Sequence, residues 1–165
     1  MAAEALTSYS KTLKAVPVRR RSAARLAAIQ ITYQSMITGR SSLAFAPDFL
    51  AHYTQELLTS FKIKDLDHAH LSALYTGVES GLEALDDTIS SALSDGWVID
   101  RLARIELAVL RCGVFELISM PNIPVKAVVS EYAALADVCG AEVGFVNAVL
   151  DRVGRLTRYV ELNSA

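Results

Sequence analysis

The sequence is poor in the features that mark secreted, metal-binding and membrane proteins. It has two cysteines, four prolines and one tryptophan in 165 residues. Cys112 and Cys139 stand alone, without the Cys-x-x-Cys spacing of zinc sites or the pattern of disulfide-rich domains, so we predict reduced, buried thiols. No apolar run approaches the roughly 20 residues that span a bilayer, and no secretory signal is recognisable. We therefore expect a cytoplasmic protein without membrane contact.

Motifs for catalysis and cofactor binding are also missing. The sequence has no glycine-rich phosphate loop and no His-Glu-x-x-His pair. His68 and His70 are two positions apart and would point to different sides of a helix. Four carboxylates fall on neighbouring helical turns, but without a histidine or cysteine beside them they favour a solvated acidic face: Glu79, Glu83, Asp86 and Asp87. We expect neither an enzyme nor a resident metal or cofactor.

Apolar residues recur at helical spacing through most of the chain. Hydrophobic residues make up 52% of the sequence, which is enough to fill the core of one domain. After Ser22, a candidate N-cap, a helical stripe is formed by Leu26, Ile29, Tyr33 and Ile37, and Gly39 follows as a stop. No alternating strand pattern competes with the helical one. The sequence predicts an all-α, single compact domain of about seven helices.

Prolines and glycines set the expected bounds of the other helices. One helix is expected to start near Pro47, and the stretch from Asp67 to Leu93 is expected to be helical with weak points at Gly77 and Gly81. Three further helices are expected from about Asp100 to Ser119, from Val125 to Cys139, and from about Val143 to Leu162. Met120-Pro121 and Gly140 are expected stops. Residues 1–20 lack an apolar period, so we predict a flexible basic arm followed by a domain over residues 21–162.

Charge is distributed unevenly along the chain. The net charge is −2, yet residues 1–25 hold six basic side chains and one acidic one, which gives +5 and leaves −7 for the rest. Residues 41–100 hold ten acidic side chains against two lysines. Arginines suit phosphate because their planar forks donate several bonds, and an acidic surface can steer a basic protein. A solvated helix start and simple solubility are the alternatives for the two surfaces.

Five pieces of sequence, in order, resemble the NusB family of transcription antitermination factors. They are Arg21-x-x-x-Arg25-x-x-Ala28-x-Gln30-x-x-Tyr33, the run from Asp100 to Arg111, Phe115-Glu116-Leu117, Ile123-Pro124-x-Lys126, and the run from Gly144 to Asp151. The resemblance covers roughly residues 19–157. Its most specific part is the closing Phe-Val-Asn-x-Val-Leu-Asp run, which begins at Phe145.

The resemblance implies an all-helical fold without catalytic activity. It also implies two partners: NusE, a ribosomal protein of the small subunit, and boxA-type single-stranded RNA of ribosomal RNA leaders, both within the antitermination complex of RNA polymerase. By position, the RNA-binding residues are Arg19, Arg20, Arg21, Arg25, Phe145 and Asn147. Asp100 and Glu106 match acidic positions that face NusE.

Several side chains allow a second interpretation. Phe145 could belong to the core, and Asn147 could form hydrogen bonds within its own helix. Arg152, Arg155 and Arg158 repeat every third residue and are expected on a solvated face. Glu116 and Glu131 are expected to pair with an arginine such as Arg111.

Two other functions stay open at this point. The chain could be a structural homodimer that masks its own RNA surface. It could also be an accessory RNA-binding domain for an enzyme that modifies ribosomal RNA, although the length and the lack of a catalytic cysteine motif lead us to expect no catalytic domain. The segment from Gly140 to Gly144 has no basic residue beside Phe145, which predicts a weaker RNA contact there.

Overall fold

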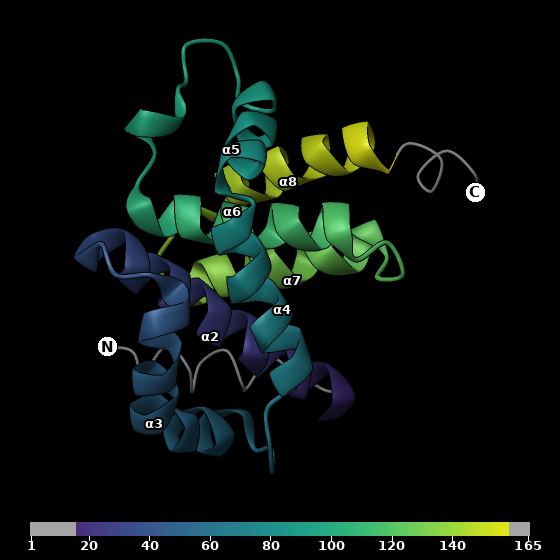
Figure 1. Ribbon diagram of the computed structural model, residues 1–165. Helices are drawn as coiled ribbons and strands as arrows, with labels where there is room; N and C mark the ends of the chain where they lie inside the picture. The colour runs from purple at the N-terminus through teal and green to yellow at the C-terminus, as the bar shows by residue number, and fades with distance from the viewer. Residues whose placement is uncertain (1–15, 159–165) are drawn as a thin grey trace. The chain divides into compact units, whose positions relative to one another are not determined.

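The chain folds as helices joined by short connections (Figure 1). A computed structural model describes residues 16–158, with side chains from Arg19 onward, and this range contains seven α-helices, one short 3₁₀ helix and no strand. The helices are α2 (Val16–Thr38), α3 (Ser42–Phe61), α4 (His68–Ser80), α5 (Leu82–Ser91), η1 (Ile99–Arg101), α6 (Arg104–Ser119), α7 (Val125–Val138) and α8 (Val143–Thr157). The predicted all-α class is confirmed. No helix in the described range is long and apolar enough to cross a membrane.

The described part of the chain divides into two compact units, one up to Glu79 and one from Ser80 onward. In the first unit, α2 packs against α3. The middle of α2 is fully buried at seven small or aliphatic positions: Ala23, Ala24, Leu26, Ala27, Ala28, Ile29 and Ile31. Because consecutive positions cover every side of a helix, α2 is buried all round and not along one stripe. Ile37, which the predicted stripe includes, is 46% exposed.

The starts of α2 and α3 differ from the prediction. α2 begins at Val16, so residues 16–20 of the expected arm are helical, and Ser22 is buried inside the helix instead of capping it. α3 begins at Ser42 and not near Pro47, because the Ser41 hydroxyl accepts a hydrogen bond from the Leu43 N–H at 3.2 Å. Residues 1–15, including Lys11 and Lys14, lie outside the described range.

Most predicted stops are confirmed. Gly39 follows α2, Gly81 separates α4 from α5, and Met120-Pro121 follows α6. α7 ends at Val138, two residues before Gly140. The last helix differs: α8 ends at Thr157 and not at Leu162, and residues 159–165 lie outside the described range.

In the second unit, α6, α7 and α8 pack against one another and α5 packs against α6. Leu150 of α8 and Tyr132 of α7 are both fully buried. The Tyr132 hydroxyl donates a hydrogen bond to the Glu116 carboxylate, which is also fully buried. The core of this unit therefore holds a satisfied polar pair among its apolar side chains.

Gly154 of α8 lies very close to α7. A Cβ atom placed on Gly154 would be 2.7 Å from Cγ1 of Val125, which is too short for two carbon atoms. Val125 is β-branched and 2% exposed, so its side chain has little freedom to move away. The absence of a side chain at Gly154 is therefore a requirement of helix packing.

We expect Gly154→Ala to lower the free energy of unfolding by about 1–3 kcal/mol through overpacking, although alanine favours a helix over glycine. Gly144→Ala is the matched control, because it lies in the same helix and its added Cβ would meet nothing closer than 3.7 Å. Urea unfolding followed by circular dichroism measures both. Equal stability of the two variants would show that α7 and α8 are not in this close contact.

Arg158, the residue after α8, caps the C-terminal end of α6. It is 7% exposed, and its guanidinium donates hydrogen bonds to five backbone carbonyl oxygens: Glu116, Leu117, Met120, Pro121 and Ile123. The last carbonyls of a helix have no partner within the helix, and a cation favours that end of the helix dipole. The expectation that Arg158 lies on a solvated face is therefore wrong. Arg155 does lie in solvent, 2.9 Å from Asp151.

Candidate functional site

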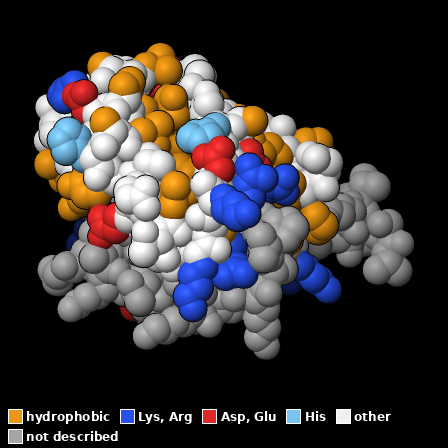
Figure 2. All heavy atoms as spheres, turned by 90° about the horizontal axis from the view of Figure 1, so that it is seen from below, with side chains coloured by type: hydrophobic (Ala, Val, Ile, Leu, Met, Phe, Trp, Pro, Cys, Tyr) orange, Lys and Arg blue, Asp and Glu red, His pale blue; other side chains and the backbone are white. Residues whose placement is uncertain are grey.

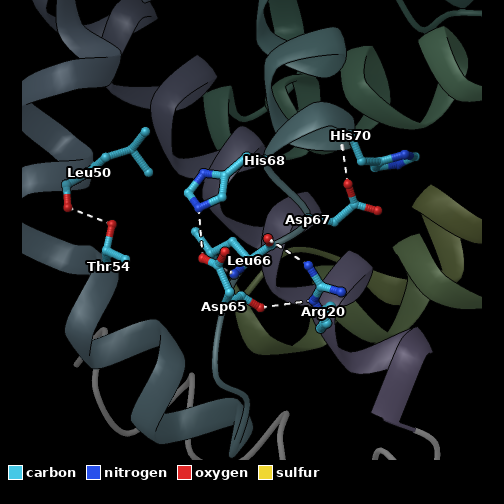
Figure 3. A network of polar contacts seen from close by, with 8 residues as sticks. All are labelled: Arg20, Leu50, Thr54, Asp65, Leu66, Asp67, His68 and His70. Atoms are coloured by element: carbon cyan, nitrogen blue, oxygen red, sulfur yellow. Dashed lines mark hydrogen bonds and ion pairs between the residues drawn. The ribbon is translucent and has the colours of Figure 1, made fainter.

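The first turns of α2 carry the three consecutive arginines of the predicted RNA site. Arg20 and Arg21 are exposed and Arg19 is half-buried. Arg19 and Arg20 donate hydrogen bonds to residues 61–67, which run from the last residue of α3 to the residue before α4 and which we name the α3–α4 segment. The acceptor for Arg19 is the carbonyl oxygen of Phe61 at 3.4 Å. The acceptors for Arg20, drawn in Figure 3, are the carbonyl oxygens of Asp65 and Leu66 at 3.2 and 3.3 Å. These contacts hold the arginine side chains in place.

The α3–α4 segment brings two further cations to the arginines. Lys62 and Lys64 are exposed and lie between the positions that Arg19 and Arg20 contact. We name these cations and the two neighbouring carboxylates the basic surface. It consists of Arg19, Arg20, Arg21, Lys62, Lys64, Asp65 and Asp67. Five basic side chains against two acidic ones give it a charge of +3. Lys and Arg side chains gather on the face of the molecule that Figure 2 shows.

The sequence does not show that Lys62 and Lys64 belong to the basic surface. They fall within residues 41–100, where ten acidic side chains give the region a negative average. The contacts between α2 and the α3–α4 segment join positions more than 40 residues apart in the sequence. Only these contacts show that the two lysines lie beside the arginines and not in the acidic region. No local sequence pattern carries this information.

The acidic members of the basic surface are already engaged. Asp65 Oδ1 lies 2.8 Å from Nε2 of His68 and accepts a hydrogen bond from the Leu66 N–H (Figure 3). These hydrogen bonds, the one from His68 first, hold the pKa of the Asp65 carboxyl below its ordinary value. Asp67 accepts from the backbone N–H of His70 at 3.1 Å and lies 3.7 Å from the Arg21 guanidinium. Arg21 is thus the least constrained of the three arginines.

Arg25 does not belong to the exposed set. Its side chain is 4% exposed, and it is engaged within the protein. The spacing of one helical turn from Arg21 suggested a shared face, but α2 is buried all round at this level. A guanidinium that is buried and engaged in this way is not available to a phosphate.

Phe145 and Asn147 lie near the start of α8 in the second unit, on different sides of the helix. Phe145 is half-buried, and its ring centroid is 5.9 Å from that of Trp97 at an interplanar angle of 41°. Asn147 is exposed and lines a cleft of about 500 Å³ between α7 and α8, together with Val125, Lys126, Val129, Ser130, Ala133, Asp151 and Arg155. Two positions on a helix are about 200° apart, so these side chains cannot contact the same group.

The two acidic residues predicted to face a protein partner are accessible. Asp100 is exposed in η1, and Glu106 is half-buried in the first turn of α6. An acidic residue in the first turn also stabilises a helix through its dipole. Glu106 therefore has a structural role in α6, and its contact with a protein partner stays a prediction.

Other acidic side chains are used inside the protein. The Glu79 carboxylate accepts hydrogen bonds from the Ser41 hydroxyl at 2.9 Å and the Ser42 N–H at 2.8 Å, at the N-terminus of α3. Asp86 forms a two-bond ion pair with Arg111 at 2.9 and 2.8 Å. These contacts correct two expectations: Glu79 and Asp86 are not simply a solvated face, and Arg111 pairs with Asp86.

The described residues contain no group of three metal-ligating side chains. Neither Cys112, which is buried, nor Cys139, which is half-buried, forms a disulfide. Burial raises the pKa of the Cys139 thiol to about 12, so this thiol stays protonated and is a poor nucleophile. The accessible side chains described above can bind anions through their arginines and lysines, and aromatic rings through Phe145.

Comparisons with known proteins agree with this description. Residues 22–155 match the model of the NusB family. The transcription antitermination protein NusB of Sphingopyxis alaskensis is 36% identical over 140 residues, which cover 84% of this chain and 94% of that protein. The one of Bradyrhizobium diazoefficiens is 38% identical over 141 residues, 84% of this chain and 86% of that protein.

A solved structure supports the same assignment at the level of fold. NusB of T. maritima superposes with a TM-score of 0.65 at 24% sequence identity, and the superposition covers 82% of this chain and 90% of that one. From the match over residues 22–155 and the identity to curated relatives over most of the chain, we conclude that this protein belongs to the NusB family.

Proposed function

We propose that the protein is a transcription antitermination factor that binds boxA-type single-stranded RNA of ribosomal RNA leaders together with the ribosomal protein NusE, within the antitermination complex of RNA polymerase. Membership of the NusB family and the name of its relatives support the role in antitermination. The observation that carries the RNA-binding part is the basic surface, which holds five cations against two carboxylates that are already engaged within the protein.

The basic surface suits a flexible polyanion. Arg20 and Arg21 are exposed, and Lys62 and Lys64 extend the positive field along the α3–α4 segment. Guanidinium groups bind phosphate with two parallel hydrogen bonds, and lysines add point charges. We assign phosphate contacts to these residues and to Arg19, and we assign Arg25 an internal role.

The second unit supplies contacts of a different kind. A half-buried Phe145 can offer part of its ring to a base, and Asn147 can donate and accept hydrogen bonds at a base edge. Because the two side chains lie on different sides of α8, we propose that they contact different nucleotides. Asp100 and Glu106 are the proposed contacts for NusE, whose basic character an acidic surface complements.

The test is a titration of fluorescently labelled boxA-type RNA and a scrambled RNA, each with and without NusE, at several salt concentrations. Binding through about three to five phosphates should give a slope of log affinity against log salt of roughly −2 to −3.5, since each contact on a single strand contributes about −0.7. We expect boxA-type RNA to bind more tightly than the scrambled RNA, and NusE to raise its affinity.

Two outcomes would contradict the proposal. Equal affinity for both RNAs would remove boxA specificity, and equal affinity with and without NusE would remove the adaptor role. Sedimentation of the free protein over a range of concentrations provides the control, because a homodimer that masks the basic surface would bind RNA only as it dissociates.

A further inference from the structure

Trp97 is presented by a tight turn between α5 and η1. The turn comprises Ser94, Asp95, Gly96 and Trp97, and is closed by a hydrogen bond from the Trp97 N–H to the Ser94 carbonyl at 3.0 Å. Gly96, its third residue, has a φ of +84°, a conformation that side chains rarely adopt. Arg152 of α8 donates a hydrogen bond to the Ser94 hydroxyl at 3.4 Å. The position of Trp97 is therefore fixed by its own turn and by α8.

The indole of Trp97 is unusually accessible. It is 52% exposed, although one part of it packs against Phe145 with ring centroids 5.9 Å apart. A large ring left half in water forgoes much of the free energy that burial would give. The two rings together form an aromatic platform, Trp97 and Phe145, at the start of α8.

Charges of both signs lie close to the platform in sequence. Asp95, Asp100 and Glu142 are exposed acidic residues, Arg101 is an exposed basic residue, and Arg152 is half-buried. The platform is therefore not part of a cluster of one sign. Stacking and apolar contact are the interactions that the platform can offer.

We propose that Trp97 is a nucleobase-stacking residue, which together with Phe145 holds one unpaired base of a bound RNA. This inference rests on the proposed function and deepens it. Stacking on an aromatic ring is a main source of affinity for single strands and tolerates any base, because every base has a π face. A docked protein is the competing occupant, but the exposed apolar side chains at this point are only Trp97 and Val98 in the 94–98 stretch.

The protein carries its own probe, because Trp97 is the one tryptophan in the sequence. Its fluorescence, excited where the six tyrosines do not absorb, should be quenched to saturation by unlabelled boxA-type RNA, with the same midpoint as the labelled titration. Trp97→Ala should weaken RNA binding about 5- to 100-fold, and Trp97→Phe should retain most of the affinity. The slope of log affinity against log salt should not change in either variant, since no phosphate contact is lost.

Val98→Ala is the matched control, because Val98 is the adjacent residue and is 54% exposed. It should leave RNA affinity and quenching unchanged, and circular dichroism should show full helicity in all three variants. Unchanged RNA affinity in Trp97→Ala would overturn the proposal. A second result would also overturn it: NusE alone quenches Trp97, and both Trp97→Ala and Val98→Ala bind NusE more weakly. That result would identify this surface as a contact for a protein.

The stacking proposal and the proposed function fail in different ways. If scrambled RNA binds as tightly as boxA-type RNA and both quench Trp97, stacking stands and boxA specificity falls. If boxA-type RNA binds specifically without quenching, the proposed function stands and stacking falls. If no RNA binds at any salt concentration, both are overturned.

Discussion

Arg158→Ala is expected to lower the free energy of unfolding by about 3 kcal/mol or more, because hydrogen bonds to a charged donor contribute about 1.5–3 kcal/mol each and several are lost together. Five carbonyl oxygens around the end of α6 would lose this donor. Alanine cannot replace any of these bonds, and because Arg158 is 7% exposed we expect water to hydrate the carbonyls only in part. The contribution of Arg158 exceeds that of any exposed ion pair in the described residues.

Urea unfolding followed by circular dichroism measures this effect, with Arg155→Ala as the matched control. Arg155 lies one turn before Arg158 in sequence, is exposed, and pairs with Asp151, so its loss should cost at most about 1 kcal/mol. Arg158→Lys should fall between the two, because an ammonium group keeps the charge but not the planar fork. If Arg155→Ala and Arg158→Ala unfold at the same urea concentration, the capping role of Arg158 is refuted.

The second large effect concerns RNA. Replacing Arg20 and Arg21 together with alanine is expected to weaken binding of boxA-type RNA about 25-fold near 0.1 M salt. Each lost phosphate contact on a single strand lowers the logarithm of the affinity by about 0.7 at this salt concentration, and two contacts are lost. The slope of log affinity against log salt should become shallower by about 1.4 for the same reason. Fluorescence anisotropy of labelled RNA at several salt concentrations measures both quantities.

The single variants separate binding from stability. Arg21→Ala removes only a 3.7 Å ion pair with Asp67 and should weaken RNA binding without changing the urea midpoint. Arg20→Ala also removes two hydrogen bonds to the α3–α4 segment, so it should lower stability by about 1 kcal/mol as well. Arg40→Ala is the control for charge, because Arg40 is exposed in the same unit but pairs with Asp48. An affinity loss in Arg40→Ala equal to that in Arg21→Ala would show that net charge alone, and not the basic surface, governs binding.

The sequence predicts the helices well where a local signal ends them. Gly81 and Met120-Pro121 stop or break helices by backbone properties that do not depend on the rest of the fold. The start of α3 cannot be predicted in this way. Pro47 is a strong signal for a helix start but lies inside α3, whereas the actual cap, Ser41, is one of two adjacent serines with no local feature to distinguish it. Glu79, 38 positions after Ser41, binds the hydroxyl of the capping residue.

The site shows the same division between local and distant causes. The arginine run and the Phe145 to Asp151 motif can be read from the chain, and the resemblance to the NusB family that they carry is confirmed. Whether an arginine meets water or the interior cannot be read in this way: Arg21 is exposed and Arg25 is buried one turn later, and Arg155 and Arg158 differ likewise. What decides each case is a partner element far along the chain, and the spacing of charges does not encode that partner.

The contacts of Arg20 have a consequence for how an anion would be received. A guanidinium has five N–H donors, and Arg20 uses two of its nitrogens on carbonyl oxygens of the α3–α4 segment. A free arginine loses up to about 2 kcal/mol of side-chain entropy when it is fixed in one rotamer. For Arg20 this entropy is lost when the protein folds and not when RNA binds. The remaining N–H donors of its guanidinium are therefore preorganised for an incoming phosphate.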